Sequence, residues 1–170
     1  MSIRRLTAAD LESYRDIRLE GLRLNPEAFG SSYEEERDRP AEEVVRRLSQ
    51  GPGAMIGAFF AERSAPADLV GTAGCYRDDT IKSRHKLLLV VMYVRPGYRR
   101  MGLGGRLAGS VLEHARETDG IVVVQLGVAC DNHAARALYD RLGFKVYGIE
   151  RKALKIGERF IDEELRALEI

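Results

Sequence analysis

Residues 94–107 read VRPGYRRMGLGGRL and join an apolar, strand-like run to a pattern typical of a helix. The first backbone N–H groups of a helix have no internal partner and lie at the positive end of its dipole, so a strand-to-helix turn attracts anions. Glycines in such a turn let a ligand approach the backbone without a Cβ in the way. The glycines are Gly102, Gly104 and Gly105, and the nearby positive charges are Arg99, Arg100 and Arg106. The segment therefore predicts a binding site for a diphosphate.

Two common phosphate-binding patterns are excluded by the same residues. A P-loop ends in Gly-Lys-Ser or Gly-Lys-Thr, which is absent here. The dinucleotide fingerprint needs a third glycine at the position that Leu107 occupies. The glycines alone are equally well explained by an ordinary strand-to-helix turn beside exposed arginines, so the surrounding sequence has to identify the ligand.

On either side of this turn, the hydrophobic pattern predicts further strands and helices. Helices are predicted at residues 11–24, 41–48, 103–117 and 133–142, with a helical middle in the loop at 29–40. Strands are predicted at residues 3–6, 55–62, 68–77, 85–94, 121–129, 144–154 and 159–170. Thr7, followed by Asp10, predicts a capping box at the start of the first helix. The run LLLVVMYV at residues 87–94 is apolar on both faces, which predicts a central strand covered on both sides.

The composition limits the class of protein. The chain has 170 residues, 45% of them apolar, and a formal net charge of +1, so it has no basic field for nucleic acid or an anionic membrane. No signal peptide is recognisable at the start, and the longest apolar run is too short for a membrane span. Cys75 and Cys130 form neither a disulfide framework nor a zinc pattern. We therefore expect one cytoplasmic α/β domain over residues 1–170, without a metal, nucleic-acid partner or membrane partner. Whether it forms a homodimer stays open.

Two motifs together resemble the signatures of the GNAT superfamily of N-acetyltransferases. Arg99-x-x-Gly102-x-Gly104, preceded by Tyr-Val-Arg-Pro at residues 93–96, is similar to the loop that binds the pyrophosphate of acetyl-CoA in that superfamily. The segment NHAARALY at residues 132–139, followed by Gly-Phe at 143–144, is similar to its second signature. The segments NPEAFGSSYEEE, KSRHK and GIERKALK also resemble one bacterial branch, so the resemblance covers nearly the whole chain.

The resemblance implies a mixed, bent β-sheet flanked by helices, and direct transfer of an acetyl group from acetyl-CoA to a primary amine. It places the pyrophosphate on the backbone amides of residues 100–105, and the pantetheine arm along residues 92–94 between two strands that splay apart. It also implies that Asn132 holds the pantetheine end and that Tyr139 is catalytic, with its hydroxyl at the thioester sulfur. The implied cofactor-binding residues are Met92, Tyr93, Val94, Arg99, Arg100, Met101, Gly102, Leu103, Gly104, Gly105, Asn132, Ala135 and Tyr139.

Each of these residues also has a plainer explanation. Tyr139 falls on the apolar stripe of its helix, which is equally typical of a core tyrosine. Asn132 stands before the same helix, where an N-cap is expected, and both roles are compatible. Cys130 has no nucleophile signature around it and is interpreted as a small buried hydrophobe.

One element of the family pattern is missing. Many GNAT enzymes have a glutamate on the central strand that acts as the general base, but this chain has Leu88 there and no Asp or Glu between Asp79 and Glu113. Deprotonation of the amine is therefore unassigned: the enzyme would prefer amines of low pKa or use an acid of the run Glu34, Glu35 and Glu36. The alternative function is a non-catalytic acetyl-CoA-binding sensor or interaction module. The acceptor amine and the acyl-chain length stay open.

Overall fold

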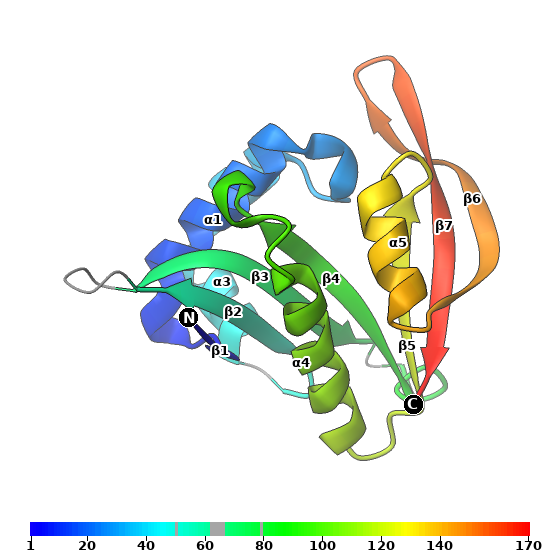
Figure 1. The fold of residues 1–170 in the computed structure, drawn as a ribbon, viewed down its shortest axis with the longest axis horizontal. Helices are drawn as coiled ribbons and strands as arrows, with labels where there is room; N and C mark the ends of the chain where they lie inside the picture. Colours follow the sequence, from blue (N-terminus) through cyan, green and yellow to red (C-terminus); the bar gives the residue numbers. More distant parts are fainter. Residues whose placement is uncertain (50, 62–66, 79) are drawn as a thin grey trace.

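Figure 1 shows the computed structural model, which describes residues 1–49, 51–61, 67–78 and 80–170. Seven strands form one sheet in the order β1-β2-β3-β4-β5-β7-β6, in which β4 and β5 are parallel and all other pairs are antiparallel. The strands are β1 (Ser2–Arg5), β2 (Ala54–Phe60), β3 (Asp68–Arg77), β4 (Lys86–Val94), β5 (Val123–Ala129), β6 (Lys145–Ile156) and β7 (Arg159–Glu169). The predicted mixed α/β fold with a bent sheet is confirmed.

Five α-helices and three short 3-10 turns connect the strands. The helices are α1 (Leu11–Leu24), α2 (Tyr33–Arg37), α3 (Ala41–Ser49), α4 (Leu103–Glu117) and α5 (His133–Arg141), and the turns are η1 (Ala8–Asp10), η2 (Pro26–Ala28) and η3 (Pro96–Tyr98). The predicted bounds of α1, α4 and β3 coincide with the observed ones. The other boundaries differ by a few residues, and residue 62, the predicted end of the second strand, lies outside the described residues.

The start of α1 is tied to β1 by a buried carboxylate. The backbone N–H of Thr7 donates to Asp10 Oδ2 (2.9 Å), so the predicted capping box forms at the start of the 3-10 turn η1, which runs directly into α1. Arg4 donates two further hydrogen bonds to the same carboxylate, at 2.8 and 2.7 Å. The hydrogen bonds from Arg4 outweigh the effect of burial and lower the pKa of Asp10 to about 2. This pair fixes where the first helix leaves the sheet.

Helices cover the two faces of the sheet unequally. On one face, α4 packs against β2, β3 and β4 through its buried stripe of Leu107, Val111, Leu112 and Ala115. On the opposite face, α1 packs against β3 and β4 and α3 packs against β2, and together they bury Tyr14, Ile17 and Leu48. Figure 1 shows α4 and α5 in front of the sheet and α1 and α3 behind its β1–β3 side. The face of β4 turned toward α1 and α3 is therefore only partly covered.

The expectation that β4 is covered on both sides is wrong for this reason. Leu87 and Leu89 are buried in the core beneath α4, but Leu88 and Val90 on the other face are only half-buried. β4 and β5 form ladder pairs only from Lys86 to Leu88, and beyond that point the two strands separate. Leu88 and Val90 line a cavity on this face, and Val90 also packs at the margin of the core beneath α1 and α3. The hydrophobic pattern alone does not distinguish a core layer from a cavity wall.

A bulge in β4 changes which side chains face which layer. Val91 has a φ of 56°, which is unusual for a β-branched residue, and the pairing between β3 and β4 shifts register there. The Thr72 hydroxyl donates to the Val91 carbonyl oxygen (3.1 Å). The extra residue reverses the alternation, so Tyr93 packs on the α1 side while Met92 and Val94 pack against the core on the α4 side.

Candidate active site

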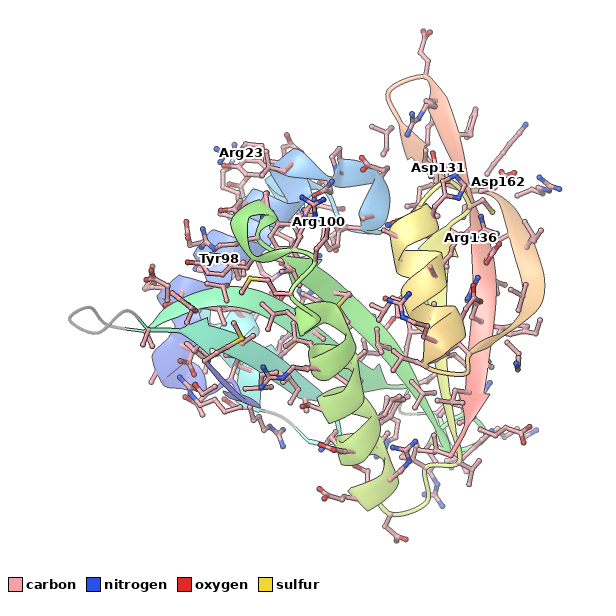
Figure 2. The ribbon with its side chains drawn as sticks, in the orientation of Figure 1. Arg23, Tyr98, Arg100, Asp131, Arg136 and Asp162 are labelled. Carbon is pink, nitrogen blue, oxygen red and sulfur yellow. The ribbon has the colours of Figure 1, made fainter. Side chains whose placement is uncertain are left out.

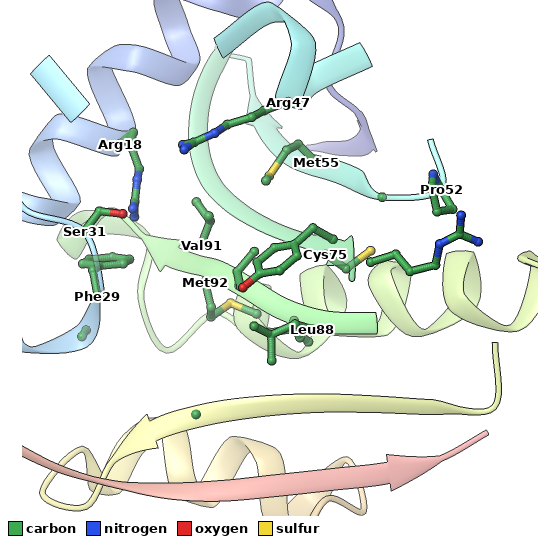
Figure 3. A pocket seen from close by; sticks show the side chains of 18 of the residues that line it. Arg18, Phe29, Ser31, Arg47, Pro52, Met55, Cys75, Leu88, Val91 and Met92 are labelled. Atoms are coloured by element: carbon green, nitrogen blue, oxygen red, sulfur yellow. The ribbon is translucent and has the colours of Figure 1, made fainter. Parts of the chain in front are cut away.

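Two cavities adjoin where β4 and β5 separate. The first, which we call the α4–α5 cavity, has a volume of about 980 Å³ and is lined by the β4–α4 turn, the start of α5 and the end of β4. The second, the α1–α3 cavity, has a volume of about 730 Å³ and lies on the other side of β4 (Figure 3). Both cavities are lined by Ala28, Phe29 and Met92. A ligand longer than either cavity can therefore reach from one to the other beside Met92.

The β4–α4 turn presents backbone amides to the α4–α5 cavity. Gly102 caps α4 in the left-handed conformation, with a φ of 76°, and no side chain accepts from the first turn of the helix. The N–H groups of the first α4 residues therefore have no partner within the helix. Arg100 also has a positive φ of 63°, and Figure 2 shows it on this turn. The lining residues of this turn are Arg99, Arg100, Gly102, Leu103, Gly104 and Gly105. The arrangement fits a diphosphate.

Two residues of the turn that the sequence predicts to bind the cofactor, Arg99 and Met101, are placed differently. Arg99 lines the cavity, but its guanidinium donates to the Val94 carbonyl oxygen (2.9 Å) and to Asn25 Oδ1 (2.9 Å). It therefore braces the turn from within the protein. Met101 is 54% exposed and is not among the residues that line either cavity.

The start of α5 forms the opposite wall of the α4–α5 cavity. Asn132 Oδ1 accepts a hydrogen bond from the backbone N–H of Ala135 (3.1 Å), so Asn132 is the N-cap of α5. Asn132, Ala135 and Leu138 all line the cavity, together with the predicted β4 residues Met92, Tyr93 and Val94. Apart from Met101 and Tyr139, all predicted cofactor residues thus gather around one cavity, although they come from segments far apart in the sequence.

Tyr139 is both a core residue and a cavity residue. Its side chain is 4% exposed and its ring packs edge-on against Phe144, with 5.7 Å between the ring centroids. It also lines the α1–α3 cavity, together with Leu88 and Met92. Among the described residues, none forms a hydrogen bond with the Tyr139 hydroxyl, and burial raises its pKa well above the usual range. The hydroxyl is therefore protonated at neutral pH and available to a ligand in the cavity.

The acids of α2 do not reach this cavity. Glu34 and Glu35 line a different hollow, between α2 and the β6–β7 hairpin. Glu36 is buried, and its carboxylate accepts hydrogen bonds from Arg47 (2.9 Å) and Arg39 (3.2 Å). Burial favours a higher pKa for Glu36, but these arginines outweigh it and lower the pKa. A carboxylate so stabilised as an anion is a weak proton acceptor.

A carboxylate that sequence reasoning missed does line the α1–α3 cavity. Glu163 on β7 is half-buried, and it lies over Gly127 of β5, where an added Cβ would be 2.8 Å from its Oε2 atom. Burial, and then the nearby charge of Glu150, raise the pKa of Glu163. Side chains alternate along β7, so Glu163 and Glu164 face opposite sides of the sheet. Only the position of Gly127 on the neighbouring strand β5 identifies Glu163 as the one that faces a cavity.

A second missed feature is the cationic wall of the same cavity. Arg18 of α1 and Arg47 of α3 both point toward the space over Val91 (Figure 3). The Arg18 side chain is 7% exposed, lies over the Phe29 ring at 4.7 Å, and has its Nη2 4.0 Å from a carboxylate oxygen of Glu36. Its Nε and Nη1 atoms are buried, and no described residue forms a hydrogen bond with them. An arginine in the middle of an amphipathic helix gives no sequence signal for this position.

Comparison with known proteins identifies the family to which this arrangement belongs. The sequence matches the model of the acetyltransferase (GNAT) family over residues 19–144. The chain belongs to this family, whose members use acetyl-CoA.

Individual relatives agree with this assignment. A stretch of 63 residues is 40% identical to the N-alpha-acetyltransferase RimI of Mycobacterium tuberculosis, a match that covers 37% of each protein. The fold is similar to an acetyltransferase of the GNAT family from Streptococcus pneumoniae (TM-score 0.82, 22% identity, 99% of both chains). It is also similar to YncA from Salmonella typhimurium, solved with its cofactor acetyl-CoA (TM-score 0.80, 21% identity, 99% of this chain and 93% of that one). The chain spans 28% and 37% of the lengths of the two curated mycobacterial relatives that it matches.

Features of two other kinds of protein are absent from the described residues. They contain no helix that is long and apolar enough to cross a membrane. They also contain no group of three or more His, Cys, Asp or Glu side chains arranged to hold a metal ion.

Proposed function

We propose that this protein is an acetyl-CoA-dependent N-acetyltransferase that acts on a primary amine by direct attack. The observation that carries the proposal is the junction of the two cavities at Met92, beside the gap between β4 and β5. An acyl-CoA bound in the α4–α5 cavity would reach the α1–α3 cavity at this junction, where an amine can meet its thioester. The membership of the GNAT family supports the same activity.

The cofactor would be held mainly by backbone groups. The amides of the β4–α4 turn receive the pyrophosphate at the N-terminus of α4, where the helix dipole favours an anion. Residues 92–94 lie along the pantetheine arm, where the backbone of β4 has no partner on β5. Asn132 keeps its Oδ1 on the helix cap and has its Nδ2 left for the pantetheine. Arg99 holds the turn in place, which is an indirect contribution to binding.

In the chemical step, the lone pair of a neutral amine attacks the thioester carbonyl carbon. A C–N bond forms, and the nitrogen gives its surplus proton to a carboxylate or a solvent molecule in the cavity. The C–S bond breaks, and the sulfur takes the electron pair of that bond and then a proton from the Tyr139 hydroxyl. A backbone N–H of β4 near Val94 polarises the carbonyl, and positioning of the two reactants supplies further acceleration. The high pKa of Tyr139 keeps it protonated until the thiolate forms.

The test is release of the CoA thiol from acetyl-CoA with a panel of amines. We expect thiol release that depends on the amine and yields an equal amount of acetylated product. The alternative, a binding module, predicts acetyl-CoA binding by calorimetry with no amine-dependent release. Failure to bind acetyl-CoA at all would contradict both.

Two further expectations belong to this proposal. We place the enzyme in the cytoplasm, which is supported by the free state of both Cys75 and Cys130, since unpaired cysteines suit a reducing compartment. We also treat residues 1–170 as one acetyltransferase domain, because a single sheet carries both cavities. Fractionation of cells and limited proteolysis test the two statements.

A further inference from the structure

The α1–α3 cavity contains a buried cation with incomplete partners. Arg18 is 7% exposed, two of its three guanidinium nitrogens have no hydrogen-bond partner among the described residues, and the third is 4.0 Å from Glu36. Burial lowers the pKa of Arg18, but a guanidinium stays charged in proteins. Buried charges are normally paired and hydrogen-bonded, because a desolvated charge is costly. The acid beside Arg18 is already shared with Arg39 and Arg47.

The charges that line this cavity are unbalanced. Among the described residues, four arginines from α1, α3 and β3 line it, and the carboxylate in the lining is Glu163 of β7, on the other side of the gap. Arg47 is paired with Glu36 and Arg77 has an interaction of its own, whereas Arg18 has incomplete partners among the described residues. The arginines are Arg18, Arg46, Arg47 and Arg77. Figure 3 shows the guanidinium groups of Arg18 and Arg47 directed at one space above β4, next to Ser31. A ligand with an anionic group complements that wall, and a planar guanidinium suits a carboxylate or phosphate.

We propose that the α1–α3 cavity binds an acceptor amine that also carries a carboxylate or phosphate group, and that Arg18 binds this anionic group. The proposal rests on the proposed acetyltransferase function, because it defines the acceptor of that reaction. The anion lies at the α1 wall, and the amine lies toward Met92 and Tyr139, where the thioester arrives. The acceptor is thereby selected by its anionic group at one end of the cavity and by its amine at the other.

Pairs of acceptors that differ in a single anionic group test the proposal. The small-molecule arm compares phosphoethanolamine with ethanolamine, and β-alanine with its amide. The peptide arm compares Ala-Glu-Ala-Ala amide with Ala-Gln-Ala-Ala amide, in which only one carboxylate differs. In the wild-type protein we expect kcat/KM for the anionic member of at least one pair to exceed that of its neutral partner by about tenfold or more, as one hydrogen bond to a charged group would give. The arm that shows the preference identifies the source of the anion.

Variants of Arg18 test whether this residue causes the preference for the anionic acceptor. Arg18→Gln should lower kcat/KM for the anionic acceptor by about tenfold or more and change the neutral one by less than about twofold. Arg18→Lys keeps the charge but loses the planar fork, so it should recover only part of the loss. Arg116→Gln, a charge removal at an exposed position of α4, is the matched control and should change neither.

The outcomes separate this proposal from the proposed function. The anion site is overturned if the wild-type protein does not prefer the anionic member of any pair. The preference is measured by turnover and by calorimetric binding to the CoA-saturated protein. Equal losses for both members in Arg18→Gln overturn the anion site as well. Because the wild-type comparison needs no variant, the result stands even if Arg18→Gln does not fold. If acetyl-CoA itself does not bind, the proposed function fails first.

A second inference rests on a different observation, the position of Glu163. This carboxylate lines the same cavity as Tyr139 and Leu88, makes no hydrogen bond or ion pair with the described residues, and lies against Gly127 on β5. A side chain at position 127 would occupy its place. The strand β4 itself carries no acid in this lining, since its residues from Leu88 to Met92 are apolar.

We infer that Glu163 is the general base that takes the proton from the attacking amine. The nitrogen lone pair forms the C–N bond, the surplus N–H proton passes to the Glu163 carboxylate, and the C–S electron pair leaves with sulfur, which takes the Tyr139 proton. Among the described residues, the charged group that acts on Glu163 is Glu150 on the paired strand β6, whereas β5 offers the uncharged Gly127. The four arginines line the same cavity but are not among the groups that change the pKa of Glu163. Burial and Glu150 favour the protonated acid, so its pKa lies above the ordinary range and the base is stronger than a free carboxylate.

The pH profile of kcat/KM tests this role. Activity should fall as the pH drops through the pKa of Glu163, because only the carboxylate accepts a proton. Glu163→Gln should lose this limb and about 10²-fold or more of kcat while acetyl-CoA affinity and Tm stay near wild type. Gly127→Ala, whose Cβ would lie 2.8 Å from the carboxylate, should reproduce part of the loss. The control is Glu34→Gln, an exposed acid outside this cavity. An unchanged profile and normal kcat in Glu163→Gln, with acetyl-CoA still bound and turned over, would exclude the base but not the acetyltransferase.

Discussion

The α4–α5 cavity and the α1–α3 cavity are assembled in opposite ways. The first is built largely from backbone: a left-handed Gly102, the free amides of α4 and the unpaired edge of β4. The second is built from side chains of α1, α3, β2, β3, β4, α5, β6 and β7, among them Arg18, Leu88, Tyr139 and Glu163. Backbone recognition needs a few small residues at fixed spacing, so it leaves a short signature. Recognition by side chains depends on how distant segments pack together, so it leaves no short signature in the sequence. The sequence therefore indicates the ligand proposed for the backbone-built cavity, but it does not indicate the ligand proposed for the side-chain cavity.

Tyr139→Phe tests the region where the two cavities meet. Among the variants Tyr139→Phe, Gly104→Val and Asp10→Asn, we expect it to have the largest effect. The change keeps the ring against Phe144 but removes the hydroxyl, so kcat should fall by at least about tenfold and by as much as 10²–10⁴-fold if the proton transfer is fully used. Acetyl-CoA affinity and Tm should stay nearly unchanged. Steady-state kinetics beside a thermal melt of both proteins measures this. Normal turnover with a lowered Tm would show a core tyrosine only.

Gly104→Val tests whether the α4–α5 cavity does recognise its ligand through backbone. A branched side chain beside the free amides should weaken acetyl-CoA binding by about tenfold or more in calorimetry. An added Cβ would also lie 3.3 Å from Leu138 Cδ2, so part of any loss could come from repacking against α5. The double variant Gly104→Val with Leu138→Ala relieves that contact, and Gly109→Ala, with open space around its Cβ, is the matched control on the same helix. Wild-type affinity in the single variant would contradict the assignment.

Asp10→Asn probes a region outside both cavities and should have the smallest effect. The folded-state pKa of Asp10 is about 2, below the ordinary value of about 3.9 for an unfolded chain, so ionised Asp10 stabilises the fold. Asp10→Asn should lower the free energy of unfolding by about 1 kcal/mol at pH 7, allowing for the half-exposed Arg4 partner. The difference between the two proteins should be fully present above pH 4 and disappear as the pH falls from about 4 to 2. Denaturant unfolding at a series of pH values measures the difference in the free energy of unfolding between the two proteins. A difference that does not change with pH would exclude the titration of Asp10 as its cause. The value of kcat/KM should be the same in both proteins.

Local sequence rules predict most of the fold correctly, and the errors have a common cause. The bounds of α1 and α4 follow from caps and periodicity, which act within a few residues. The prediction for the second face of β4 is wrong, because an apolar side chain is equally suited to a core and to a ligand cavity. The bulge at Val91 is not predictable either, since a valine at positive φ contradicts its own preference and is held there by pairing with β3 and by the Thr72 hydroxyl.

The sequence by itself determined the family, the mixed sheet and the group of residues around the α4–α5 cavity, because these depend on short-range glycine spacing and helix capping. The tertiary structure decided which side chains share the α1–α3 cavity. It brought Glu163 beside Gly127, removed Glu36 from the candidates for the base by surrounding it with arginines, and left Arg18 without full partners. The physical reason is that a charge takes its chemistry from its desolvation and its neighbours, and both are set by contacts between residues far apart in the chain.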